Sequence, residues 1–264
     1  MSDRSRVAAA ARDNAEWCHA FCEAHGVVGV LGLDAWSSDR RTPDGYPDAV
    51  TLRPGLAADA VLALVDAGPG CSVKDSFADL DLAPSGFDVL LEASWIWHPA
   101  PAPRGPASAW REVTDEAGLV AWEAAWAAGP PSGVFRPGLL GRRGVRLLAE
   151  GADGAVRAGC VVTRGSAGVV GLSNVFDVDG GDPWPGILGW VAAHLPGRAV
   201  VGYERGADLA AARSAGFVPV GDLRVWLCQA PAADAGARPG DVRGDERPRR
   251  VVASFLLLGE WKRC

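Results

Sequence analysis

The sequence is short of lysine and has no long apolar run. Lysine occurs only at Lys74 and Lys262 among 264 residues, and the formal net charge is −6. Nucleic-acid binding needs a concentrated basic surface, so we expect no nucleic-acid partner. No apolar stretch approaches the roughly 20 residues of a membrane span, and the N-terminus lacks the apolar core of a secretory signal. We therefore expect a cytoplasmic protein with no membrane partner.

The six cysteines show no spacing typical of a disulfide framework, which predicts reduced thiols. Cys18, Cys22 and His25 are spaced to share one face of a helix, where thiolate and imidazole groups can bind zinc. No second Cys/His pair has zinc-like spacing, and buried cysteine also packs as a small apolar side chain. We therefore predict no metal site.

The composition, 48% hydrophobic and 22% charged, is typical of globular domains with substantial cores. The proline-rich stretch WHPAPAPRGPAS (97–108) predicts a linker that divides the chain near 103. Small, charged and helix-breaking residues from 229 onward predict a flexible tail. The predicted organisation is a domain at 1–103, a second at 104–228 and a tail at 229–264.

Both halves alternate between helical and strand-like periodicity. The first half predicts a helix over 5–25 that Gly26 ends, a helix over 56–68, and strands over 27–36, 46–52, 70–77 and 88–98. The second half predicts helices over 118–129, 183–195 and 207–217, and strands over 145–152, 155–165, 169–178, 199–206 and 218–227. The repeated order suggests an internal duplication.

Four stretches of the second half resemble the GNAT superfamily of acyl-CoA-dependent N-acyltransferases. They are VVGLSNVFDV, PGILGWVAAHL, RAVVGYE and LAAARSAGFVPVGDLRVWL, within residues 110–228. Residues 45–97 resemble a second, truncated copy. The resemblance implies an α/β (α+β) fold with two GNAT-like mixed-sheet domains in tandem, the first truncated.

In that superfamily the fourth and fifth strands separate and admit the pantetheine arm of acetyl-CoA or another acyl-CoA. A glycine-rich turn at a helix N-terminus then holds the diphosphate. By resemblance, Leu172, Ser173, Asn174 and Gly186 would bind the cofactor. Pro183 takes the place of a Gln or Arg of that turn and has no N–H to donate. The prolines can equally be the ordinary start of a helix.

Bulky and negatively charged side chains also make this turn less suited to binding a diphosphate. Leu188 replaces the second small residue, and Asp177, Asp179 and Asp182 place negative charge nearby. We therefore expect a damaged diphosphate site in the second half. In the first half, Arg53 and Gly55 offer a cation and room for an anion, although Arg-Pro-Gly is also a common strand-to-helix turn.

The tyrosine that often protonates the departing thiolate in the superfamily is replaced here by Ala212. The remaining catalytic candidates are Glu204, as the base that takes the amine proton, the neighbouring Tyr203, and Glu92, a carboxylate within an apolar alternation. The alternative is that both carboxylates are structural and pair with arginines such as Arg224.

Substrate contacts are predicted for two further pairs of residues. Asp75 and Ser76 follow Lys74 at a strand end, where they can polarise a substrate or cap the next turn. Trp97 and Trp184 can line an apolar cleft between the halves, or simply fill a core.

Three functions fit these observations. The first is a small-molecule N-acyltransferase, of a kind found in secondary metabolism, that joins an amine to an acyl group from a thioester. The second is a catalytically degenerate GNAT-like protein that binds a ligand or a partner. The third keeps the reaction but takes the acyl group from an acyl carrier protein, which needs no contact with a CoA diphosphate.

Overall fold

A computed structural model of the chain describes residues 1–102, 109–152 and 154–229. Eleven strands form one sheet in the order β1-β2-β3-β4-β11-β5-β10-β9-β8-β7-β6. The sheet is therefore continuous across the predicted division near 103. The predicted tail lies almost entirely outside the described residues.

The helices match the predicted periodicity in four of five cases. They are α1 (Asp3–Ala24), α2 (Ala58–Leu62), α3 (Glu116–Trp126), α4 (Trp184–His194) and α5 (Gly206–Ser214), with 3-10 turns η1 (Ala83–Ser85) and η2 (Pro137–Leu139). Gly26 has φ +74° just beyond α1 and ends that helix as predicted. Helix α2 is shorter than predicted because it has no side-chain cap and buries only Val61.

The strands of the first half are β1 (Val30–Leu31), β2 (Ala35–Ser37), β3 (Ala49–Thr51), β4 (Ser72–Asp75) and β5 (Phe87–His98). Those of the second half are β6 (Trp110–Glu112), β7 (Val145–Glu150), β8 (Ala158–Thr163), β9 (Val170–Asp177), β10 (Val200–Glu204) and β11 (Val218–Cys228). Among these strands, the three-residue edge strand β6 was not predicted from the sequence, and β1 and β2 were predicted as one strand.

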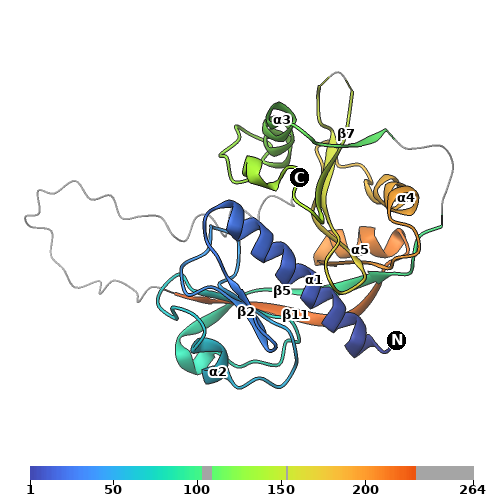
Figure 1. The fold of residues 1–264 in the computed structure, drawn as a ribbon. Coiled ribbons are helices and arrows are strands. Elements are labelled where there is room, and N and C mark those ends of the chain that lie inside the picture. Colours follow the sequence, from blue (N-terminus) through green and yellow to red (C-terminus); the bar gives the residue numbers. More distant parts are fainter. Residues whose placement is uncertain (103–108, 153, 230–264) are drawn as a thin grey trace, which may run out of the picture.

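Helices cover both faces of the sheet. Helix α1 crosses the middle of the molecule, between the region of α2 and that of α4 and α5 (Figure 1). Its apolar face packs on the central strands through Val7 and Ala11, and further along it joins α3 in a core around Trp17 and Phe21. Helices α4 and α5 pack on the opposite face. No helix of the described residues is long and apolar enough to cross a membrane.

The last strands of the two halves are exchanged. Strand β5 belongs to the first half but lies between β10 and β11. Strand β11 belongs to the second half but lies between β4 and β5. Each half also contains one parallel pair, β3 with β4 and β9 with β10. This repetition agrees with a duplicated architecture, and the tandem origin stays a prediction.

Candidate functional site

The parallel strands β9 and β10 separate after a short contact. Their register contains two residue pairs, Val170 with Val200 and Gly171 with Val201. Strand β9 then continues to Asp177, while β10 ends at Glu204. The corresponding strands β3 and β4 also share two residue pairs but end almost at once. Among the residues that the structure describes, only those of the second half therefore leave a long strand edge beside an opening between parallel strands.

A bulge in β9 lies beside this opening. Val161 of β8 pairs with Ser173, whereas Gly159 pairs with Phe176, so β9 contains one extra residue. Asn174 takes φ +52°, an uncommon conformation for a residue other than glycine, and its amide donates to Ser173 Oγ at 3.2 Å. The bulge turns these two polar side chains away from the regular alternation of the strand.

Helix α1 covers the closed end of the opening. A small cavity of about 10 Å³, room for about one water molecule, is lined there by Asp13, Asn14, Trp95, Ser173 and Gly202, among others. Asp13 and Asn14 were not identified from the sequence. Asn14 occupies a position of the buried stripe of α1, and a polar residue at such a position was the signal that could have revealed it.

Asp13 is a buried carboxyl group that fastens α1 to the β8–β9 hairpin. Its carboxylate accepts from Thr163 Oγ1 at 2.6 Å and from the Gly165 N–H at 3.3 Å. Burial raises the pKa of Asp13 to about 6, although the hydrogen bond from Thr163 opposes this effect. Asp13 can therefore gain or lose a proton near neutral pH.

Lys74 from the first half reaches the same region. Its side chain is buried, its Nζ donates to Asn14 Oδ1 at 2.9 Å, and it lies 4.3 Å from the centre of the Tyr203 ring. No ion pair to Lys74 is found within the described residues. Lys74 of β4, Asn14 of α1 and Tyr203 of β10 thus lie close together, so residues of both halves meet here.

Tyr46 is a second tyrosine, besides Tyr203, whose hydroxyl group lies near the bulge. Its ring stacks on Phe21 of α1 with centroids 3.6 Å apart. Burial raises the pKa of Tyr46 well above the usual value for tyrosine, and a hydrogen bond to Asn174 partly opposes this rise. The phenol therefore stays protonated at neutral pH and can donate. Tyr46 was not identified from the sequence as a site residue.

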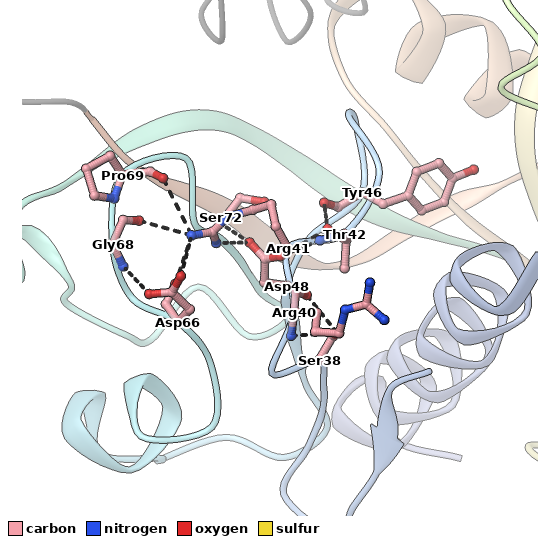
Figure 2. Close-up of polar contacts among 10 residues, drawn as sticks. All are labelled: Ser38, Arg40, Arg41, Thr42, Tyr46, Asp48, Asp66, Gly68, Pro69 and Ser72. Carbon is pink, nitrogen blue, oxygen red and sulfur yellow. Dashed lines mark hydrogen bonds and ion pairs between the residues drawn. The ribbon is translucent and has the colours of Figure 1, made fainter. Parts of the chain in front are cut away.

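The loop between β2 and β3 holds Tyr46 in place through Asp48. The buried Asp48 carboxylate accepts from Thr42 N, Ser72 N and Arg41, the last at 2.7 Å. Figure 2 shows these bonds, with the Tyr46 ring extending away from them toward α1. The Arg41 guanidinium also donates to the carbonyl oxygen of Asp66 at 3.0 Å. A buried anion thus ties two loops of the first half together.

The turn before α4 already holds an anion of the chain itself. The Asp177 carboxylate accepts from Asp179 N at 2.9 Å and Gly181 N at 3.0 Å, and it pairs with Arg157. A Cβ added to Gly186 would lie 2.1 Å from Trp110 Nε1, so this glycine gives room to an indole ring. Asp177 thus occupies two N–H groups just before the expected diphosphate turn, and within that turn Trp184 N donates to Asp182 Oδ1 at 3.1 Å.

The corresponding turn of the first half is occupied in the same way. Gly55 N donates to Asp79 Oδ2 at 2.7 Å, and the exposed Arg53 pairs with Asp34. Helix α2, which follows, is only five residues long. Neither predicted residue of this turn reaches the opening between β9 and β10.

The remaining predicted residues are dispersed. Leu172, Ser173, Asn174 and Tyr203 lie at the opening, and Glu204 is buried at the end of β10, facing the opposite side of the sheet from Tyr203. Glu92 is exposed and pairs with Arg224 at 2.9 Å, which was the structural alternative.

The predicted substrate residues do not meet at one place. Asp75 accepts from Phe77 N and Leu80 N and so caps a turn, which was the structural alternative. Ser76 is buried beside it, and its Oγ has no hydrogen bond within the described residues. Trp97 and Trp184 belong to different cores on opposite faces of the sheet, so they do not line one cleft.

Comparisons with solved structures identify the fold. The chain is similar to a GCN5-related N-acetyltransferase from Kribbella flavida, with a TM-score of 0.56, 14% identity, and coverage of 88% of this chain and 97% of that one. It is also similar to a proposed acetyltransferase of the GNAT family from Novosphingobium aromaticivorans, with a TM-score of 0.52, 16% identity, and coverage of 81% and 96%. No protein-family model matches the sequence, and neither does any curated protein.

Proposed function

We propose that this chain, which has the fold of the GNAT superfamily, is an N-acyltransferase that moves an acyl group from a thioester to a small-molecule amine. The observation that carries the proposal is the separation of β9 and β10 beyond Leu172 and Gly202, next to the bulge at Asn174. The unpaired edge of β9 supplies backbone donors and acceptors for the amides of a pantetheine arm. The fold alone does not carry the function, because one fold can host many functions.

The reaction needs two proton transfers. The amine nitrogen attacks the thioester carbonyl, the new C–N bond forms, and the C–S bond breaks. Backbone N–H groups at the bulge stabilise the negative charge on the carbonyl oxygen. Asp13 from one face of the sheet, or Glu204 from the other, takes the amine proton. Tyr203, Tyr46 or solvent returns a proton to the thiolate.

The donor that fits best is an acyl group carried by a protein rather than by free CoA. In both halves the backbone amides near the expected diphosphate position donate to carboxylates of the chain, Asp177 and Asp79. A CoA diphosphate would have to displace a like-charged group, which is unfavourable. A carrier-bound pantetheine presents the same thioester arm without the diphosphate.

The test measures binding and turnover with acetyl-CoA, longer acyl-CoAs and acyl carrier proteins. Gly202→Leu places a side chain in the opening, because even a Cβ at this position lies 3.0 Å from the Leu172 carbonyl oxygen. Gly189→Leu is the matched control, since a Cβ there meets nothing within 4 Å. We expect a thioester to raise the melting temperature of the wild type and of Gly189→Leu but not of Gly202→Leu.

Two results would contradict the proposal. Gly202→Leu that is folded by circular dichroism and still responds to the thioester would place the donor elsewhere. Absence of both binding and turnover with every thioester would leave a non-catalytic binding protein as the better interpretation.

A further inference from the structure

A groove lies at the end of the sheet opposite to the opening between β9 and β10. It has a volume of about 310 Å³, which lies in the range of small-molecule sites. The turn 141–144, the first residues of β7 and the last residues of β8 line it, together with Glu112 and Leu195. Strand β9 begins near this end and separates from β10 toward the other end, so the two places are distinct.

Four arginines surround the groove, although the whole chain is acidic. Arg142 pairs with Glu23, and Arg146 lies 3.3 Å from Glu112. Arg143 and Arg164 make no ion pair within the described residues. The groove therefore has two guanidinium groups that are not neutralised, next to two that carboxylates already hold in place.

Two glycines fix the turn that carries Arg142 and Arg143. Gly141 has φ +68° and Gly144 has φ +85°, conformations that other residues rarely adopt. A Cβ on Gly144 would also lie 2.9 Å from the carbonyl oxygen of Arg164, whose own N–H donates to Gly144 O at 2.8 Å. This close contact holds the turn against the end of β8, where Arg164 follows the strand.

We propose that this groove binds a small molecule that carries a phosphate or diphosphate group. Guanidinium groups form paired, charge-assisted hydrogen bonds with phosphate oxygens, and two unneutralised arginines match the charge of a dianion. Glu112 keeps Arg146 at the rim and would lie beside the ligand. The proposal does not depend on acyl transfer, because its arginines lie away from the opening, although Thr163 lines both this groove and the small cavity under α1.

Isothermal titration calorimetry with inorganic pyrophosphate, ADP and 4′-phosphopantetheine tests the groove, with citrate as a phosphate-free polyanion. The variant Arg143→Ala/Arg164→Ala removes the two unneutralised charges. Arg4→Ala/Arg213→Ala removes the same charge from exposed positions elsewhere. We expect at least one phosphate probe to bind, with its Kd raised at least tenfold in the first variant and changed less than twofold in the second. Binding should also weaken as salt rises.

Several outcomes would overturn the proposal. They are no binding of any phosphate probe, equal weakening in both double variants, or citrate binding as tightly as the phosphates. Binding of an acidic carrier protein without binding of any small phosphate would assign the groove to a protein partner instead. Tighter binding of ADP than of pyrophosphate would support the proposal and point to a nucleotide, and the reverse order would support it with the diphosphate as the recognised group.

Discussion

The carboxyl group of Asp13 changes its proton affinity when the chain folds. Its pKa rises from 3.8 to about 6, chiefly because burial disfavours the charged form. Below pH 4 the group is protonated in both the folded and the unfolded states, so it has no effect on stability. Between pH 4 and 6 the unfolded chain releases the proton first, and above pH 6 the folded chain must hold a buried negative charge.

Asp13→Asn should therefore remove a pH-dependent loss of stability. The replaced side chain does not titrate and can still bond Thr163 and Gly165. We expect the unfolding free energy of the variant, relative to the wild type, to increase by up to about 3 kcal/mol from pH 4 to pH 7. Urea unfolding of both proteins across this range measures the difference. A difference that stays constant with pH would show that Asp13 keeps an ordinary pKa.

In the proposed reaction, the turn between β9 and α4 is the element expected to select the thioester donor. Asp177 ends β9, and its carboxylate satisfies two N–H groups of the turn that follows. These two N–H groups lie just before α4, whose first N–H, that of Trp184, donates to Asp182 Oδ1. A paired N–H attracts an anion less than a free one. The loop stabilises itself with its own side chain, so a diphosphate must compete with that side chain.

Asp177→Ala should increase the affinity for CoA because it removes the competing charge and frees the N–H groups of Asp179 and Gly181. One unit charge at about 4 Å in water is worth about 1 kcal/mol, which corresponds to roughly a fivefold lower Kd. Asp179→Asn is the control, since it removes the same charge from the turn without releasing either N–H group. CoA titrations of the three proteins test this. Equal affinities would mean that the carboxylate does not exclude the diphosphate.

At the scale of the whole molecule, the exchange of β5 and β11 binds the two halves together. Strand β5 supplies the neighbour of β10, and β11 supplies the neighbour of β4. The two exchanged strands also pair with each other along most of their length. A cut near 103 therefore removes a central strand from the second half and leaves edges of the sheet unpaired.

Neither fragment 1–103 nor fragment 104–229 should fold alone, whereas a mixture of both should. We expect weak circular dichroism and no cooperative thermal transition for each fragment, and recovery of a cooperative transition after co-expression. A cut at 153 also separates β5 from β10 and β11, so fragments 1–153 and 154–229 should depend on each other in the same way. Cooperative folding of fragment 104–229 by itself would show that the second half is an independent domain.

Local patterns in the sequence predicted most elements, because the helical and strand periods depend on which residues must be buried. Helix α1 with its stop at Gly26, the long strands β5 and β11, and the order of the second half are examples. The strand over 169–178 was also predicted, and a bulge interrupts it at Ser173 and Asn174. Periodicity did not reveal the three-residue β6, the division between β1 and β2, or the short length of α2, since none of these elements is long enough to show a period.

The sequence by itself determined the type and order of the elements and the composition of their buried faces. The tertiary structure alone decided that β5 and β11 change places and that Asn14, Lys74 and Tyr203 meet under α1. It also decided that carboxylates occupy both expected diphosphate turns. The physical reason is sequence separation, because a hydrophobic pattern reports only on residues that are close together in the chain. A buried ammonium, a paired carboxylate or a shared strand depends on groups that lie tens to hundreds of residues apart along the chain.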